Sequence, residues 1–268
     1  MKSLKRIFLF ICVLACFFSC KQDQQTNHSD SKTVTNTHDT VIETKSGCDT
    51  DIKPCIDIRV EYPELANFSV GIKQSVYDYL LEYLADFMVT EQPIAQQNLP
   101  EFLQASASAI ERDRNLATQQ TDYRLHFTAS EMFANDSLIC IRQQYSLEEE
   151  TRTMSGEGYA IFDLESENLL SLESIVFNES ALHDLLLSKL KSSQGIPESD
   201  DISSVGFLFA DEDFAVTDNL GISANEMFFT YLPQEIAPES AGLIRIVLNK
   251  TEVSQLLQPA FVKKWESR

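Results

Sequence analysis

Cys20 is the residue whose surroundings most directly predict a chemical modification. It follows an apolar run at residues 7–18 and the small residue Ser19, and the chain before that run is basic. A basic start, a short apolar stretch and a small residue before the cleavage point are typical of a secretory signal, and a cysteine directly after that point is the residue that lipoproteins acylate. We therefore expect residues 1–19 to be a signal peptide and Cys20 to carry a lipid that anchors the protein to a membrane.

Two alternatives to this interpretation are open. The apolar run could be a membrane helix that is never removed, but its twelve residues fall short of the about 20 that cross roughly 30 Å of hydrocarbon. Cys16 could be acylated instead, although cleavage there would leave two phenylalanines at the new amino terminus. With Cys20 acylated, we expect the protein in the cell envelope, on the outer membrane, facing either the periplasm or the surface.

Three further cysteines remain in the mature chain: Cys48, Cys55 and Cys140. The envelope is an oxidising compartment, and turn-forming residues lie between the first two, so a Cys48–Cys55 disulfide is the pairing that we expect, although the sequence leaves the connectivity open. No histidine lies at ligand spacing from these cysteines, which argues against a zinc site. We expect neither a metal nor a cofactor.

The folded part of the chain shows no local signature of a catalytic centre. It has no Gly-x-Ser-x-Gly turn and no glycine-rich phosphate loop before a helix. Its two histidines are His126, predicted on the polar face of a strand, and His183, predicted at the surface or as a cap of a helix. We assign no catalytic residue, and the sequence leans against an enzyme.

Acidic residues leave two options open. Four of them crowd one predicted turn: Asp211, Glu212, Asp213 and Asp218. They lack the residue order of a calcium-binding loop, so a solvated acidic turn is favoured over a calcium site. Two carboxylates that folding brings together leave no signature in a sequence, so a hydrolase that uses such a pair stays an alternative.

The charge balance restricts the partners. The chain has 41 acidic and 21 basic residues, a formal net charge of −20, and removal of residues 1–19 would make it more negative. Nucleic-acid affinity depends on lysine and arginine, so we expect no nucleic acid partner. A negative field steers cationic proteins toward the molecule, although solubility explains the same composition.

Composition also divides the chain. Residues 20–54 contain few large apolar side chains and many Thr, Ser, Asp and Gln, which predicts a disordered linker after the acylated cysteine. The following stretch of about 200 residues is long enough for a real core. We expect one domain with room for two lobes, at residues 55–150 and 151–262.

Hydrophobic periodicity predicts the elements that must position any site. Apolar residues three and four apart predict helices at 68–88, 99–115, 182–190 and 251–257, and alternation predicts strands at 56–61, 123–129, 139–147, 158–163, 205–209, 222–232 and 243–248. An Asn135-Asp136 turn joins two of these strands as a hairpin. The order predicts an α+β fold with antiparallel sheets and helices packed on one side.

Three segments of the second half carry a family resemblance. They are Phe162-Asp163-Leu164 with residues 170–177, then Phe214 to Ile222 with its Thr217 and Gly221, and Glu235-Ile236-Ala237-Pro238 with Ala241-Gly242. Together they resemble the DUF3298 family, also called the RsiV C-terminal family after an anti-sigma factor. The order of elements in residues 55–150 resembles the DUF4163-like module that usually precedes it.

The resemblance implies a module that binds rather than catalyses. In the anti-sigma factor the module senses lysozyme, a basic protein, and in some deacetylases a related module accompanies a cell-wall enzyme. We therefore expect a basic protein such as lysozyme, or a cell-wall glycan, as the partner. The candidate ligand loop comprises Gln234, Glu235, Ile236, Ala237, Pro238 and Glu239. The candidate aromatic residues for a glycan groove are Tyr159, Phe207, Phe209 and Tyr231.

Overall fold

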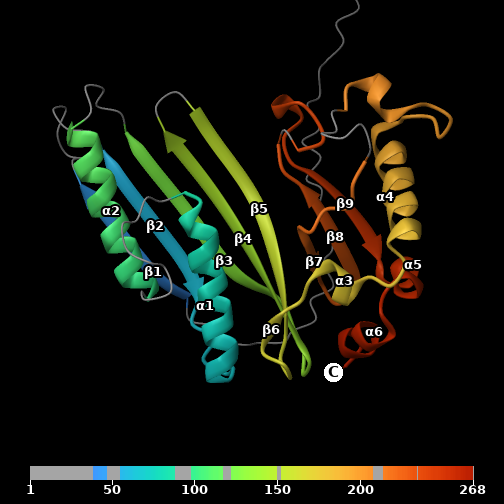
Figure 1. Ribbon diagram of the computed structural model, residues 1–268, viewed down its shortest axis with the longest axis horizontal. Helices are drawn as coiled ribbons and strands as arrows, with labels where there is room; N and C mark the ends of the chain where they lie inside the picture. The colour runs from blue at the N-terminus through green and yellow to red at the C-terminus, as the bar shows by residue number, and fades with distance from the viewer. Residues whose placement is uncertain are drawn as a thin grey trace, which may run out of the picture. The chain divides into compact units, whose positions relative to one another are not determined.

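A computed structural model describes residues 39–46, 55–87, 98–116, 122–149, 152–207, 214–233 and 235–267. Figure 1 shows that its strands form two sheets with helices beside each. Within these ranges, no helix is long and apolar enough to cross a membrane. The predicted α+β class is confirmed.

The larger sheet contains six strands in the order of the chain. They are β1 (Asp39–Ser46), β2 (Ile56–Pro63), β3 (Tyr123–Ala134), β4 (Leu138–Glu149), β5 (Arg152–Asp163) and β6 (Asn168–Leu169). All neighbours pair antiparallel except β2 and β3, which are parallel. A parallel pair needs a long crossover, and the segment that carries both helices of the first half supplies it.

These two helices, α1 (Val70–Ala85) and α2 (Leu99–Leu116), pack on one face of the large sheet. The Ser69 side chain caps α1 by accepting a hydrogen bond from the Ile72 backbone N–H at 3.1 Å. The buried residues of α1 recur three, four and five positions apart and face the inward residues of β2 and β3. This helix–sheet core confirms the two predicted helices of the first half.

The smaller sheet has three antiparallel strands, β7 (Leu220–Ile222), β8 (Glu226–Tyr231) and β9 (Ile244–Asn249). The helices of the second half are α3 (Leu172–Ile175), α4 (Glu179–Gln194), α5 (Lys250–Val253) and α6 (Pro259–Trp265), with 3-10 turns at Ile202–Val205, Glu239–Ala241 and Ser254–Leu256. Apolar residues of this sheet share a second core with α4, α5 and α6.

Strands β4 and β5 contribute to both cores. Ile139 and Phe162 belong to the core under α1 and α2, whereas Cys140 and Ile161 belong to the core of the smaller sheet. Successive side chains of a strand point to opposite faces, so a strand that is apolar at every position can bury both faces. The boundary predicted at residue 150 therefore falls inside a hairpin that serves both halves.

Four predictions of secondary structure need correction. Asp39–Ser46 lies within the predicted disordered linker but forms β1, because it pairs along its whole length with β2 and its Ile42 packs against the first core. The strand predicted at 222–232 is two strands, since Ser223 turns the chain by accepting from the Asn225 and Glu226 N–H groups.

The other two corrections concern the second half. The strand predicted at 205–209 is wrong at Val205, which is the last residue of a 3-10 turn. Asp201 caps the start of this turn, and Gly206, at φ 97°, follows its end. Residues 208 and 209 lie outside the described ranges. The final helix predicted at 251–257 is α5 followed by a 3-10 turn, and a further helix, α6, buries Phe261 and Trp265.

Candidate functional site

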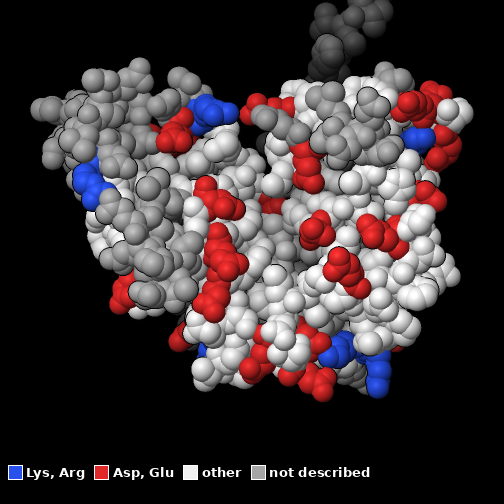
Figure 2. Space-filling model, viewed as in Figure 1, with Lys and Arg blue, Asp and Glu red and all other residues white. Residues whose placement is uncertain are grey.

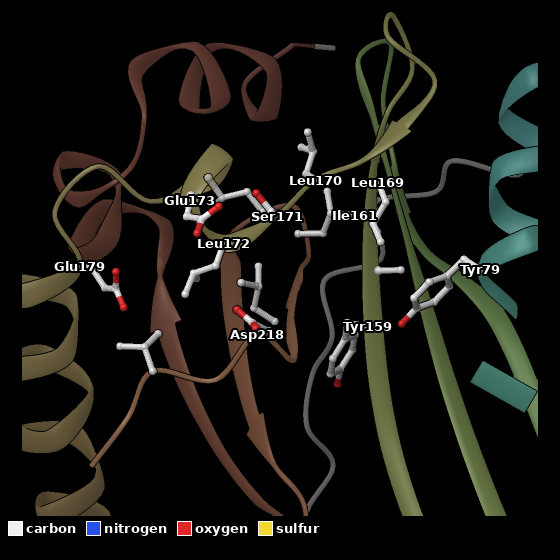
Figure 3. A pocket seen from close by; sticks show the side chains of 14 residues that line it. Tyr79, Tyr159, Ile161, Leu169, Leu170, Ser171, Leu172, Glu173, Glu179 and Asp218 are labelled. Atoms are coloured by element: carbon white, nitrogen blue, oxygen red, sulfur yellow. The ribbon is translucent and has the colours of Figure 1, made fainter. Parts of the chain in front are cut away.

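A cleft with a volume of about 660 Å³ lies beside β5 (Figure 3). We call it the Tyr159 cleft. Its lining residues come from β5, from the segment that runs from β6 to the first residue of α4, from the segment that leads into β7 with the first residue of that strand, and from α1. They are Tyr159, Ala160, Ile161, Leu169, Leu170, Ser171, Leu172, Glu173, Ile175, Glu179, Val216, Asp218, Leu220 and Tyr79. The volume lies within the range of small-ligand sites.

Tyr159 is held rigidly in this cleft. Its ring stacks on Phe228 of β8 with centroids 6.1 Å apart, and its hydroxyl donates a hydrogen bond to Glu157. Gly221 of β7 makes room for the ring, because a Cβ on Gly221 would lie 2.4 Å from the Tyr159 ring. Burial, and then the bond to the Glu157 carboxylate, raise the pKa of Tyr159. The phenol therefore stays neutral, donates its hydrogen bond to Glu157, and forms one side of the cleft.

Glu157, which binds the Tyr159 hydroxyl, is a buried carboxylate with 4% of its surface exposed. It accepts hydrogen bonds from Arg142 of β4 (Nε at 3.0 Å), from Gln144 (Nε2 at 3.1 Å) and from Arg245 of β9, besides the Tyr159 hydroxyl. Burial raises the pKa of Glu157, but the bonds from Tyr159 and Arg142 and the charge of Arg245 outweigh it, so the pKa is lowered. Glu157 stays ionised and joins the two sheets.

Asn219 explains part of the segment that resembles a family motif. Its side-chain amide donates to the Glu157 carbonyl oxygen (2.8 Å) and accepts from the Tyr159 N–H (3.1 Å), as the peptide group of a neighbouring strand would. Thr217 orients the turn by accepting a hydrogen bond from the Asn219 N–H. The motif residues Thr217 and Gly221 therefore fix how β7 sits against β5.

The rim of the Tyr159 cleft is acidic. Glu173, Glu179 and Asp218 are exposed, and Figure 3 shows them on one side of the cleft, with Tyr79 and Tyr159 on the other. The floor between them is apolar and includes three buried side chains: Ile161, Ile175 and Leu220. None of the described lining residues is Lys or Arg. An apolar floor with an anionic rim suits a group with an apolar stem and a positive end, such as a lysine or arginine side chain.

The predicted ligand loop lies elsewhere. Ile236 and Ala237 are buried, and Ile236 belongs to the second core. Glu235 folds back so that its carboxylate accepts from the Leu232 N–H at 2.8 Å. Pro238 and Glu239 are exposed and border two smaller hollows, of about 380 and 530 Å³ respectively. Gln234 lies outside the described residues, and the loop contributes no lining residue to the Tyr159 cleft.

The cysteine predictions meet the structure only in part. Cys55 is disulfide-bonded. Cys140 is buried and free, with its pKa raised to about 12 by burial, so the partner of Cys55 is not among the described residues. Cys48 and Cys20 lie outside the described ranges, and the Cys48–Cys55 pairing and the acylation of Cys20 stay predictions.

The other candidate residues are placed as follows. His126 is exposed on β3, and His183 is half-buried against the Phe214 ring, 5.5 Å between centroids. Tyr159 and Tyr231 are buried, with 5% and 1% of their surfaces exposed, so the expectation that they line an exposed aromatic groove is wrong. Each tyrosine uses its hydroxyl and its ring inside the fold: Tyr159 bonds Glu157 and stacks on Phe228, and Tyr231 bonds the Ala215 carbonyl oxygen and contacts the Phe214 ring.

The remaining candidates need little comment. Phe207 is half-buried beside the hollow at Ala237, and Phe209 is outside the described residues. Asp218 is exposed, and its three predicted companions, at 211–213, are also outside. Over the described ranges, no three His, Cys, Asp or Glu side chains gather closely enough to hold a metal ion.

Sequence reasoning did not find several residues of the site. Glu157 lies in a Gly-Glu-Gly-Tyr stretch that reads as weak strand, and Glu173 and Glu179 stand at the starts of helices, where acids are common for capping reasons. The two glycines that flank Glu157 were the available signal. On β5 each of them faces a large side chain, Tyr145 over Gly156 and Gln143 over Gly158.

Comparison with known proteins agrees with this fold. Residues 174–251 match the sequence model of DUF3298, a protein family of unknown function. A crystal structure of a DUF3298 family member from Bacteroides fragilis superposes with a TM-score of 0.66 at 16% identity, covering 87% of this chain and 98% of that one. A DUF3298 family protein from Pseudomonas aeruginosa gives a TM-score of 0.57 at 15% identity, covering 84% and 96%.

No curated protein matches the chain significantly. The comparisons leave the predicted DUF4163-like preceding module untested. They confirm the resemblance of the second half. Residues 174–251 match the DUF3298 model, and the chain that surrounds them has the fold of solved DUF3298 proteins.

Proposed function

We propose that this protein is a lipid-anchored envelope protein whose folded part binds a cationic protein, of which lysozyme is an example, through the Tyr159 cleft. The observation that carries the proposal is the lining of the cleft, which combines three exposed carboxylates with an apolar floor and includes no Lys or Arg among its described residues. A basic side chain can bury its aliphatic stem against the floor while its charge meets the rim.

The rest of the surface supports the same partner. The chain carries a net charge of −20, and on the face drawn in Figure 2 acidic side chains are far more frequent than basic ones. Such a field accelerates association with a cationic partner and weakens with salt. Arg142 and Arg245 are paired with the buried Glu157 and are not among the residues that line the cleft.

The alternatives receive less support from the geometry. A glycan site usually presents exposed aromatic faces, and the tyrosines Tyr159 and Tyr231 are buried. A carboxylate-pair hydrolase needs one acid that holds its proton near neutral pH, which burial usually provides. The three rim carboxylates are exposed, and the buried one, Glu157, has a lowered pKa.

The experiment measures binding of lysozyme to the folded part by calorimetry at low and moderate salt. The test variant combines Glu173→Gln, Glu179→Gln and Asp218→Asn. The matched control combines Glu64→Gln, Glu101→Gln and Asp86→Asn, three exposed acids outside the cleft, so that both variants change the net charge equally. Exposed ion pairs contribute about 0.2–1 kcal/mol each, which predicts roughly tenfold weaker binding for the cleft variant.

The control variant should bind within about twofold of the wild type once salt screens the general field. Equal losses in the two variants would show that only net charge matters and would remove the cleft from the proposal. No binding of the wild type at either salt concentration would end it. The anchor is tested separately, because Cys20→Ala should release the protein from membranes and leave lysozyme binding intact.

A further inference from the structure

The outer edge of β5 is closed over half of its length and open over the rest. In Figure 1, β5 is the last long strand of the large sheet, and β6 covers only its end, at Phe162 and Asp163. Next along the edge, the Leu170 N–H donates to the Ile161 carbonyl oxygen at 2.8 Å, and the Asn219 amide bonds to Tyr159 and Glu157. The edge from Glu157 to Asp163 is therefore covered by β6, by the Leu170 N–H and by the Asn219 amide.

The stretch from 152 to 155 has no such cover. The groups that Asn219 engages belong to odd-numbered residues, and strand geometry turns alternate residues to the same side, so the N–H and C=O groups of Thr153 and Ser155 also point away from β4. Both residues are exposed, and no strand of the described chain pairs with them on that side. Proteins usually block such an edge with a proline, a bulge or inward charges. Here the register with β4 is unbroken and only Arg152 is charged.

A wall stands opposite this open edge. Thr153 and Ser155 line the hollow of about 530 Å³, whose far side is formed by Leu232, Pro233 and Glu239 of the segment after β8. The hollow is therefore a groove with a free strand edge on one side and apolar and acidic side chains on the other. The outward backbone groups can pair with an added strand, whose alternate side chains would then face that wall.

We propose that this groove binds an extended, basic segment of the partner protein, which adds a strand to the open edge of β5. The lining of the groove holds one acidic residue, Glu239 on the wall, and one basic residue, Arg152 at the end of the open edge. The strongly negative charge of the whole chain, −20, therefore selects a basic segment, and Glu239 is its contact on the wall. Backbone pairing supplies affinity that does not depend on sequence, and alternate lysines or arginines facing Glu239 supply the preference. The choice of a basic partner rests on the proposed function, whereas the pairing edge does not.

The probe is an end-capped octapeptide of alternating lysine and valine, with an alternating glutamate and valine peptide as the charge control. Binding is measured by fluorescence anisotropy, and amide exchange at Thr153 and Ser155 is followed by NMR. The basic peptide should slow exchange at both amides by about tenfold or more at saturation, since each would gain a backbone hydrogen bond. The same peptide with N-methyl groups on alternate backbone nitrogens should not bind, and the acidic peptide should bind far more weakly.

Two variants separate the backbone from the side chain. Ser155→Pro removes an outward N–H that β4 does not use, and an edge strand accepts proline at such a position; binding should fall about tenfold. Ser155→Ala keeps the N–H and should bind within about twofold of the wild type. Protection of the Tyr159 amide by Asn219 reports that the edge above is intact in both variants.

Several results would overturn the inference: peptide binding without slower exchange at Thr153 and Ser155, equal affinity for the N-methylated peptide, or unchanged affinity of Ser155→Pro. Protection that appears without peptide and rises with protein concentration would mean that a second copy pairs with this edge, which also overturns it. If Ser155→Pro leaves lysozyme binding intact and the cleft variant abolishes it, the proposed function is retained and the groove is rejected as a binding site. Edge protection by the peptide without any lysozyme binding would do the reverse.

Discussion

Replacing Gly221 by alanine tests whether Tyr159 is held as tightly as the structure shows. A Cβ at position 221 would lie 2.4 Å from the Tyr159 ring, about 1 Å closer than ordinary contact, so the ring or β7 must move. The ring has no free direction, because Phe228 stacks on it and Glu157 binds its hydroxyl. Overpacking of this kind costs about 1–3 kcal/mol, and the better strand propensity of alanine offsets about 0.5–1 kcal/mol.

We therefore expect Gly221→Ala to lower the free energy of unfolding by about 1–2 kcal/mol, measured by urea denaturation. A double-mutant cycle isolates the cause. In a Tyr159→Ala background the ring is absent, and Gly221→Ala should be neutral or slightly stabilising. In a Tyr159→Phe background the ring remains but Glu157 no longer holds it, so a cost between those of the other two backgrounds should return. An equal cost of Gly221→Ala in all three backgrounds would refute the argument, since it would place the strain in the backbone of β7.

Three further predictions concern the joints of the fold. Glu157→Gln should lower stability at pH 7 by about 2 kcal/mol, less than for a fully buried pair because its arginines are 35% and 33% exposed. Folding lowers the pKa of Glu157, so the stability that its carboxylate contributes is complete above the ordinary pKa of 4.5 and is lost as the pH falls through the folded-state pKa. The denaturation curves of the wild type and of Glu157→Gln should therefore converge in acid. Asn219→Ala should speed amide exchange at Tyr159 and cost about 1–2 kcal/mol; unchanged exchange would contradict the edge closure. Asn135→Ala should cost about 1–3 kcal/mol and loosen α6 in exchange measurements, because Asn135 Nδ2 donates to the Lys264 carbonyl oxygen (2.9 Å) and the Ser267 carbonyl oxygen (3.1 Å).

Where the sequence prediction succeeded, a local pattern carried the information. The helix α1 was predicted because Ile72, Val76, Leu80 and Leu84 recur at helical spacing, and β2 and β3 because apolar and polar residues alternate. Where the sequence prediction failed, the structure of a segment depended on which strand it pairs with. A short polar run such as Asp39–Ser46 becomes a strand only because β2 offers it a partner.

The candidate site shows the same division. The sequence predicts that Asp218 lies in a solvated acidic turn and makes Tyr159 a candidate for a glycan groove, whereas the structure places both residues in the lining of the Tyr159 cleft. The ligand loop was recognised as a formed loop, and it is one, yet its apolar residues Ile236 and Ala237 face inward. A family motif shows that positions matter without showing whether they fold the chain or bind a partner, and Gly221 serves the fold.

The sequence alone determined the acidic charge, the α+β class, most helices and strands, and the DUF3298 resemblance of the second half. These properties follow from composition and from patterns within a few turns or one strand. The tertiary structure alone decided that β5 serves two cores, that Glu157 is buried among arginines, and where the cleft and the open edge lie. Those features join residues of different elements, such as Arg142 and Glu157, 15 positions apart, and Asn219 and Glu157, 62 positions apart. Local periodicity carries no information about which elements will pack together.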